Sequence, residues 1–289
     1  MGQPLHLRGC LLLAAASCAA PDARARARLR GPARLANASS ALVLKDRRLP
    51  APTSRALVAR RRLSGDYAQL AKLVAGDAAA GDKFGSSVAI DGDTIVAGAP
   101  NDEGVGRESG SVYVFRTSDG GATYDEMAKL TASDAAAWDR FGTSVAIDGD
   151  TVVVGAFREG NTGYCNSCSG SGAVYVSRTA DGGATYDQVA KLTSSDAAAG
   201  DKFGSSVAIG GDAVVVGTYA KDAAYVFRTT DGGATYGQVA KLTASDAAAD
   251  DIFGWSVGID GDTIVVGALG DDDAGSNSGS AYVFRTTDG

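Results

Sequence analysis

Paired aspartates are the residues of this sequence whose type and spacing could do chemistry. Two aspartates five positions apart occur in each of four related segments, as Asp77 and Asp82, Asp134 and Asp139, Asp196 and Asp201, and Asp246 and Asp251. Two nearby carboxylates can act as acid and base in glycoside hydrolysis, or they can bind a cation. A catalytic site is normally one constellation of unlike residues, whereas these pairs recur. We therefore interpret them as residues that cap turns and keep loops solvated.

Other catalytic groups are scarce in the repeated part of the chain. The single histidine, His6, precedes it, which removes the commonest general base. The sequence contains no nucleophile elbow and no phosphate-binding loop motif. Arginines recur at one equivalent position of each segment, which indicates a structural or solvent-exposed role; they are Arg116, Arg178, Arg228 and Arg285. The sequence predicts that this protein is not an enzyme.

Two cysteines, Cys165 and Cys168, lie in the repeated part of the chain. A zinc site would need two more soft ligands, and this part has no histidine and no other cysteine. We predict a small loop disulfide between Cys165 and Cys168, which suits an oxidising compartment; two free thiols are the alternative.

The N-terminal region has the character of a targeting sequence. Residues 1–20 contain a short apolar run followed by small residues, which predicts a signal peptide. Residues 21–66 are rich in Arg and Ala and predict a leader or linker without a fold of its own. We expect a secreted or cell-surface protein, with import into an organelle through the Arg-rich presequence as the alternative. Asn37 begins a glycosylation sequon in this leader.

Charge is divided between the two parts of the chain. The net charge is −7 overall, but residues 1–62 carry +11 and the remainder −18. An acidic body repels nucleic acid and anionic membrane surfaces, and it favours cations or basic partner surfaces. No later segment has the roughly 18 apolar residues that a membrane helix needs. We therefore expect no nucleic-acid partner and no membrane insertion of the body.

Internal repetition indicates which elements position these residues. Residues 67–289 divide into four copies of a similar segment, approximately 67–124, 125–186, 187–236 and 237–289. Each copy reads as four short strands, of which the second and third are joined by Asp-Gly, as at Asp91-Gly92. We expect a two-residue hairpin there, with the glycine giving the positive φ of a type I′ turn. The pattern predicts an all-β protein, a β-propeller of four-stranded antiparallel blades; a β-solenoid or a sandwich is the alternative.

A Phe-Gly pair occurs once in each copy, followed by a Gly-Ala-Pro-like tripeptide such as Gly98-Ala99-Pro100. The pairs are Phe84-Gly85, Phe141-Gly142, Phe203-Gly204 and Phe253-Gly254. We expect the ring to fill the contact between blades and the glycine to permit close approach. This pattern resembles the FG-GAP repeat of the amino-terminal propeller of integrin α subunits. The resemblance implies a propeller and, by analogy, extracellular adhesion or ligand recognition.

The chain departs from that family in two respects. Members that bind calcium carry a longer Asp-rich loop between the Phe-Gly and Gly-Ala-Pro strands, whereas Asp91-Gly92-Asp93 occupies that place here. So short a hairpin cannot wrap an ion that needs 6–8 oxygen ligands, so we predict no cofactor, and calcium is not supported by the loop spacing. Integrin propellers have seven blades and this chain supplies four, so either four blades close by themselves or the propeller is incomplete.

A second resemblance concerns the turns between copies. Thr117-x-Asp119-x-Gly121-x-Thr123-Tyr124 is similar to the Asp-box of sialidases and recurs at 179–186 and 229–236. In that family the motif is structural and lies away from the catalytic site. The resemblance keeps a propeller glycosidase, or a fragment of one, as an alternative function.

The loops between the third and fourth strands differ strongly among copies, although the strands hardly change. Alternate turns of antiparallel strands lie at opposite ends, so these loops and the paired aspartates should share one end of the blades. A variable surface on a constant scaffold is typical of a binding site. We therefore expect non-catalytic recognition of a protein or glycan through these acidic loops; a passive structural repeat is the second alternative. Trp138 and Trp255 near that end could stack on a ligand, but packing in the core or at the rim is their more ordinary explanation.

Overall fold

The computed structural model describes residues 68–161, 163 and 170–286 of the 289-residue chain. These residues belong to one compact unit, Gly65–Gly289. The predicted signal peptide and leader, the Asn37 sequon, and the candidate disulfide of Cys165 and Cys168 lie outside the described residues. The predictions about them stay predictions.

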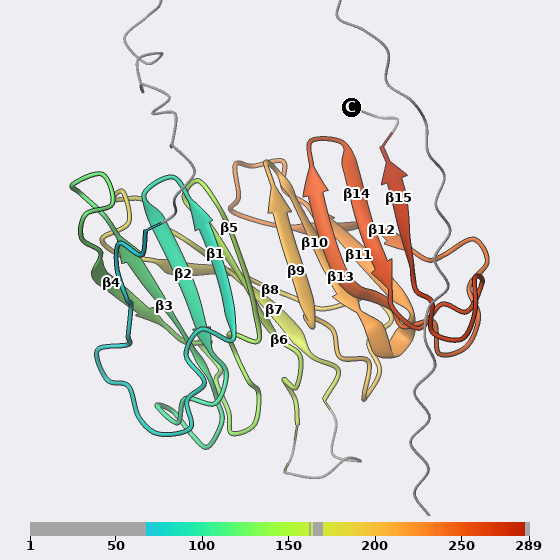
Figure 1. Cartoon of the computed structure of the whole chain (residues 1–289), viewed down its shortest axis with the longest axis horizontal. Helices are drawn as coiled ribbons and strands as arrows, with labels where there is room; N and C mark the ends of the chain where they lie inside the picture. The colour runs from blue at the N-terminus through green and yellow to red at the C-terminus, as the bar shows by residue number, and fades with distance from the viewer. Residues whose placement is uncertain (1–67, 162, 164–169, 287–289) are drawn as a thin grey trace, which may run out of the picture. The chain divides into compact units, whose positions relative to one another are not determined.

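The described residues form four antiparallel sheets, in which neighbouring strands follow chain order (Figure 1). The first sheet contains β1 (Ser87–Asp91), β2 (Thr94–Ala99), β3 (Ser111–Arg116) and β4 (Asp125–Leu130). The second contains β5 (Ser144–Asp148), β6 (Thr151–Ala156), β7 (Ala173–Arg178) and β8 (Asp187–Leu192). The third contains β9 (Ser206–Gly210), β10 (Ala213–Thr218), β11 (Ala223–Arg228) and β12 (Gly237–Leu242), with the short 3-10 helix η1 (Tyr219–Lys221) between β10 and β11. The fourth contains β13 (Phe253–Asp260), β14 (Thr263–Ala268) and β15 (Ser280–Arg285).

The sheets are offset from the sequence repeats by one strand. The Ala-Lys-Leu segment that opens the second copy becomes β4, the outer strand of the first sheet, and β8 and β12 arise in the same way. The corresponding segment of the first copy, residues 69–73, forms no strand, and the fourth sheet has three strands among the described residues. Each complete sheet therefore joins two successive copies.

The tight hairpins differ from the expected turn type. Asp91 pairs with Thr94, so the two loop residues are Gly92 and Asp93. Gly92 has a φ of 53°, whereas Asp93 is not among the residues with positive φ. A type I′ turn needs positive φ at both loop residues, and glycine at the first position alone is the pattern of type II′. The two-residue hairpin forms, but the predicted turn type is wrong.

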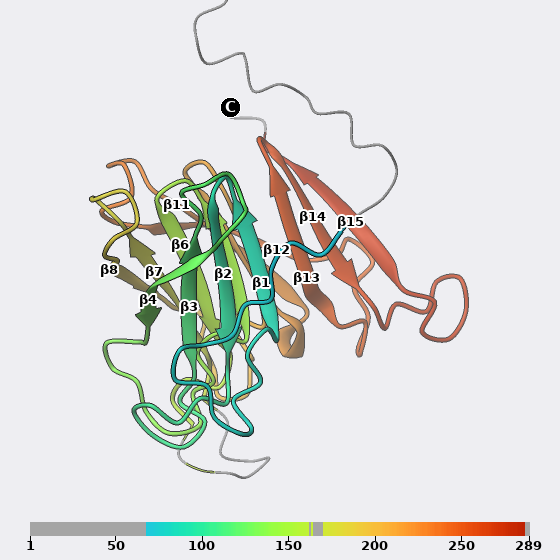
Figure 2. The same cartoon turned by 60° about the vertical axis from the view of Figure 1, so that its left-hand side comes forward.

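The sheets pack face to face in chain order, as Figures 1 and 2 show. The contact between the first and second sheets buries Val96, Val112 and Val114 against residues of the second sheet that include Val152 and Tyr175. The second and third sheets repeat this contact with equivalent residues. Burial of each such side chain contributes about 1.5–3 kcal/mol, which identifies these contacts as the main source of cohesion. The structure thus confirms an all-β fold of stacked antiparallel sheets.

The Phe-Gly pairs lie at these contacts. Phe141, Phe203 and Phe253 are almost completely buried, whereas Phe84 in the first copy is half-buried. A Cβ atom on Gly98 of β2 would overlap the carbonyl oxygen of Gly142, so glycine is required where the two backbones approach.

Among the described residues, no helix is long and apolar enough to cross a membrane.

Candidate ligand-binding face

Two sets of loops meet at one end of each sheet, which we call the loop end. One set comprises the paired-aspartate loops before β1, β5, β9 and β13, and the other joins β2 to β3, β6 to β7, β10 to β11 and β14 to β15. Backbone hydrogen bonds join the two sets, as from the Asn101 N–H to the Asp82 carbonyl oxygen, 3.2 Å. The hairpins and the turns between copies share the opposite end, where the Thr117 N–H donates to the Asp93 carbonyl oxygen at 3.0 Å.

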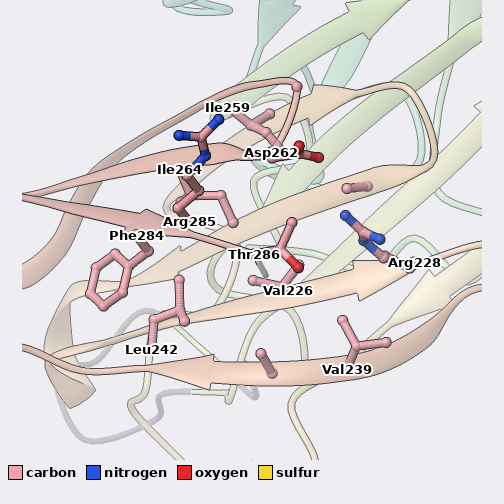
Figure 3. A pocket seen from close by; sticks show the side chains of 13 residues that line it. Val226, Arg228, Val239, Leu242, Ile259, Asp262, Ile264, Phe284, Arg285 and Thr286 are labelled. Atoms are coloured by element: carbon pink, nitrogen blue, oxygen red, sulfur yellow. The ribbon is translucent and has the colours of Figure 1, made fainter. Parts of the chain in front are cut away.

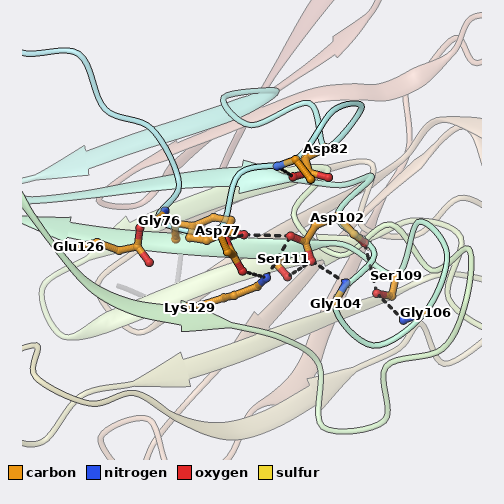
Figure 4. A network of polar contacts seen from close by, with 12 residues as sticks. Gly76, Asp77, Asp82, Asp102, Gly104, Gly106, Ser109, Ser111, Glu126 and Lys129 are labelled. Carbon is orange, nitrogen blue, oxygen red and sulfur yellow. Dashed lines mark hydrogen bonds and ion pairs between the residues drawn. The ribbon is translucent and has the colours of Figure 1, made fainter.

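A polar network lies at the loop end of the first sheet (Figure 4). The Lys129 Nζ is 2.6 Å from Asp77 Oδ2 and 3.0 Å from Asp102 Oδ2. The Tyr113 hydroxyl donates to Asp77 at 2.6 Å and lies 2.9 Å from Asp102 Oδ2. Ser111 Oγ donates to the other oxygen of Asp102 at 3.0 Å. The network ties the paired-aspartate loop to β3, to β4 and to the loop after β2.

The charges of this network stabilise one another. Hydrogen bonds from Lys129 and Tyr113 lower the pKa of Asp77. Burial alone would raise the pKa of Asp102, but Lys129 and the Gly104 N–H outweigh it and the pKa is lowered. Burial likewise opposes the charge of Lys129, yet bonding to Asp77, Tyr113 and Asp102 raises its pKa. All three ionisable partners of the ion pairs are therefore charged at neutral pH.

Equivalent networks recur in the next two sheets. In the second sheet Tyr175 and Lys191 both contact Asp134, and Lys191 also pairs with Glu159 at 2.8 Å. In the third sheet Tyr225 and Lys241 both contact Asp196, at 2.5 Å and 2.7 Å. The first aspartate of each of these three pairs, Asp77, Asp134 and Asp196, is thus an ion-pair partner, a role that the sequence analysis did not assign.

The second aspartate of each pair caps its own loop. Asp82, Asp139, Asp201 and Asp251 each accept the backbone N–H of the residue three positions earlier, at 2.6–2.8 Å. Asp139 differs from the others because its Oδ1 is buried without a hydrogen-bond partner. Burial raises the pKa of Asp139 to about 6. The described residues contain no group of three or more acidic, histidine or cysteine side chains placed to hold a metal ion.

The loop end of the first sheet contains a polar pocket of about 390 Å³. Its lining includes both aspartates of the first pair, Glu103, Arg107 and Lys129. Arg107 also lies over the ring of Trp138, 4.7 Å from its centroid. This pocket presents charges of both signs on a rim that belongs to the variable loops.

A second pocket of about 220 Å³ lies between the loop ends of the second, third and fourth sheets. Phe157, Tyr219 and Trp255 line it together with Thr143 and Ser205, whose hydroxyls donate to backbone carbonyl oxygens. The rings of Tyr219 and Trp255 are 5.2 Å apart, and Trp255 is 50% exposed. Half-exposed aromatic rings beside hydroxyl groups can stack on a sugar ring or on a side chain of a protein partner.

A third pocket, of about 460 Å³, lies away from the loop end between the third and fourth sheets (Figure 3). Val226, Val239 and Leu242 of the third sheet face Ile264 and Phe284 of the fourth across it. At the two preceding contacts between sheets, Tyr186 and Tyr236 pack in the core. Between the third and fourth sheets, the tyrosine that packs in the described part of the chain is Tyr282 of β15, and none comes from a turn between copies.

The turns between copies are held by their aspartates. Asp119 accepts the N–H groups of Ala122 and Thr123, both at 2.9 Å, and the Thr123 backbone and hydroxyl lower its pKa. Arg178 donates to the Gly232 carbonyl oxygen in the turn of the next sheet. The arginine at this position therefore links neighbouring sheets.

These features define a class of protein: a repeat of propeller-type blades in which the framework recurs from copy to copy and the loops at one end differ. The family model of the FG-GAP repeat matches the chain four times, at residues 67–115, 124–177, 186–236 and 236–284. The chain belongs to the FG-GAP repeat family, which confirms the resemblance drawn from the Phe-Gly pairs.

Comparison with individual proteins adds little to this assignment. No curated protein matches the chain. Among solved structures, the WD40 β-propeller domain of Doa1 is 12% identical with a TM-score of 0.40, over 69% of this chain and 51% of that one. A 6-phosphogluconolactonase-like protein from Bacteroides uniformis is 14% identical with a TM-score of 0.45, over 71% and 54%. The chain spans about half the length of these two structures.

Proposed function

We propose that this protein is a non-catalytic binding module that recognises a glycan or protein ligand through the loop end, outside the cell or at its surface. One observation carries the proposal. The same framework of strands and ion pairs recurs in the first three sheets, while the loops at one end of the sheets differ and line two unlike pockets. Variation confined to one end of a constant scaffold is the arrangement of binding surfaces.

The two pockets favour different parts of a ligand. The aromatic pocket of Phe157, Tyr219 and Trp255 offers stacking surfaces next to hydroxyl groups. The polar pocket offers Glu103 as an exposed carboxylate beside Asp77, which is already paired with Lys129. An uncharged sugar suits the first pocket, and a basic side chain suits the second because of the acidic body around it.

The way in which the carboxylates are used supports a module without turnover. The first aspartates of three pairs are bonded to lysine and tyrosine, and the second aspartates cap loops. A glycosidase needs one carboxylic acid and one carboxylate free to face the substrate. Asp139 has the raised pKa of a general acid, but its exposed fraction is only 2%.

The experiment follows the fluorescence of Trp255 in a Trp138→Phe background, where Trp255 is the single remaining tryptophan. The protein is titrated with a panel of neutral oligosaccharides and, separately, with a lysine-rich peptide. We expect a saturable change with at least one oligosaccharide, and about tenfold weaker binding by calorimetry for Trp255→Ala, since one stacked ring is worth roughly 1.4 kcal/mol.

Val239→Ala is the matched control, because Val239 is 59% exposed but lines the pocket away from the loop end. Its affinity should equal that of the parent. Binding that is insensitive to Trp255→Ala and to Glu103→Gln would place the ligand elsewhere and contradict the proposal. Release of umbelliferone from a panel of umbelliferyl glycosides, if abolished by Asp139→Asn, would show an enzyme instead.

A further inference from the structure

Part of each outermost face of the stack of sheets is apolar and exposed, although Leu73, Phe84 and Tyr124 pack over Tyr113 and Phe115 on the first sheet. On the fourth sheet Val283 is 68% exposed, and Val265 beside it is 41% exposed. On the first sheet Val88 is 67% exposed and Ile90 63%. Clustered exposed aliphatic residues of this kind mark surfaces that pack against a partner.

The exposed residues of these two faces correspond in the repeat to residues that pack against each other between the first and second sheets. Val265 and Val283 correspond in the repeat to Val96 and Val114 of the first sheet, which are completely buried against the second sheet. On the other side of that contact, Val145 and Ile147 correspond to Val88 and Ile90. The fourth sheet therefore presents two of the valines that neighbouring sheets bury, with Ala281 in place of Val112, to a face that carries the equivalents of Val145 and Ile147.

The fourth sheet also has an edge strand, β15, with one side unpaired among the described residues. β3, β7 and β11 each pair with an outer strand, whereas β15 pairs only with β14 in the described part of the chain. The segment that would occupy the outer position is Gln69-Leu70-Ala71-Lys72-Leu73, which corresponds to β4, β8 and β12 and forms no strand. An open strand edge accepts an added strand through main-chain hydrogen bonds.

Charge supplies an independent match. The fourth sheet contains Asp246, Asp271 and Tyr282, the equivalents of Asp77, Asp102 and Tyr113. The Tyr282 hydroxyl donates to Asp271 at 2.7 Å, with Asp246 beside it. In the first three sheets the outer strand brings a lysine to these carboxylates, namely Lys129, Lys191 or Lys241. Among the described residues, no lysine or arginine pairs with Asp246 or Asp271. Lys72 of the first copy corresponds to Lys129, Lys191 and Lys241; it is exposed and forms no ion pair with these carboxylates.

We propose that copies of this chain associate head to tail, with residues 69–73 of one copy added to the free edge of β15 in another. Lys72 then pairs with Asp246 and Asp271 of the second copy, and the Val88 and Ile90 face covers Val265 and Val283. The sheets contact one another in chain order, and Figure 1 places the first and fourth sheets at opposite ends of the row, which favours a second copy over the same chain as the occupant. Such a contact is heterologous, so it extends or closes a ring according to its rotation.

The same association should also form two hydrogen bonds to the backbone that recur between neighbouring sheets of the chain. Ser87 and Ser144 donate their hydroxyls to the Gly142 and Gly204 carbonyl oxygens of the next sheet, each at 2.8 Å. Ser256 of the fourth sheet is the equivalent donor, and Gly85 of the second copy is the equivalent acceptor. Likewise Asp91 accepts the Gly149 N–H of the next hairpin at 2.7 Å, and Asp260 would accept that of Gly92.

Sedimentation velocity of the full chain over a range of concentrations tests the proposal. We expect species of at least twice the chain mass of 29.0 kDa, and a single species of the chain mass at all concentrations would overturn it. Val283→Arg and Val88→Arg should each shift the protein to the chain mass, while circular dichroism stays unchanged because both positions are exposed. Val105→Arg, in an exposed loop at neither face, is the matched control and should keep the parental mass.

Mixing the two variants identifies the geometry. An equimolar mixture of Val283→Arg and Val88→Arg retains one intact face on each partner, so it should form a complex of two copies that does not grow further. No complex in the mixture, or dissociation by only one of the two substitutions, would contradict a head-to-tail contact. Lys72→Glu should also dissociate the assembly, and Lys72→Glu combined with Asp246→Lys should restore it, which a merely structural defect would not do.

Discussion

Val176 and Val283 occupy the same position of the repeat, in sheets of nearly the same sequence, but their surroundings are opposite. Val176 of the second sheet is completely buried against the third sheet, whereas Val283 of the fourth sheet is 68% exposed. The strands form equally well in both places. The comparison teaches that local sequence specifies each sheet, while the adjoining sheet supplies the burial that stabilises it.

The largest expected effect compares two glycines at one repeat position, Gly155 and Gly267. A Cβ on Gly155 would overlap the Gly204 carbonyl oxygen of the third sheet, whereas on Gly267 it would meet only the Ser256 hydroxyl, which can rotate away. In dilute solution we expect Gly155→Ala to lose more than about 5 kcal/mol of unfolding free energy or to prevent folding, and Gly267→Ala to lose less than about 1 kcal/mol. Urea denaturation followed by circular dichroism measures both.

Equal losses for the two glycine variants would mean that the close approach of sheets does not depend on this position. If copies associate head to tail, Gly267→Ala should have one further effect. Because Gly267 would then face Gly85 of another copy, Gly267→Ala should weaken association while leaving the fold of the single chain intact.

The next effect compares two phenylalanines of the Phe-Gly pairs. Phe203 is 1% exposed and its ring lies 5.8 Å from that of Tyr225, whereas Phe84 is half-buried. Phe203→Ala should cost about 3–5 kcal/mol of unfolding free energy, and Phe84→Ala about half as much because part of its ring is already in water. Thermal and urea unfolding of the two variants measures the difference; a larger loss for Phe84→Ala would contradict the account of the end faces.

The sequence was sufficient to predict the structural features that depend on neighbouring residues and recur in each copy. Alternating strands, two-residue hairpins and turns with Asp119-type aspartates each depend on residues close together in the chain. The predicted type I′ turn was wrong because Asp91 pairs with Thr94. The two loop residues are therefore Gly92 and Asp93, one position later than the predicted Asp91-Gly92. Register between strands decides that point, and composition does not reveal it.

The features that sequence analysis missed depend on contacts between copies. Lys129 and Asp77 are 52 positions apart, and they meet because the outer strand of each sheet comes from the following copy. One signal was available: a tyrosine in the strand before each turn and a lysine in the strand after it recur together with the first aspartate of each pair. For the aromatic pocket, Phe157 and Tyr219 stand at the position of Pro100 in their copies, so the sequence showed the residue types but not that they meet Trp255.

The smallest expected effect compares two aspartates that cap equivalent loops, Asp139 and Asp201. Asp201 Oδ2 pairs with Lys221 at 2.8 Å, whereas Asp139 has a buried oxygen without a partner and a pKa raised by burial to about 6. The unfolded chain loses this proton near pH 4, before the folded chain does, so the folded state loses stability as the pH rises from about 4 to about 6. Asp139→Asn keeps an oxygen for the Ala136 N–H and carries no charge.

We therefore expect Asp139→Asn to match the parent near pH 4 and to exceed it above pH 6, by up to about 3 kcal/mol of unfolding free energy. Asp201→Asn is the control and should lower stability at neutral pH, because it removes one partner of an ion pair with Lys221. Urea denaturation between pH 4 and pH 8 measures both variants. A parent whose stability rises from pH 4 to pH 8 in parallel with Asp139→Asn would show that Asp139 is ionised without penalty, and the interior of the stack would then be more polar than its burial indicates.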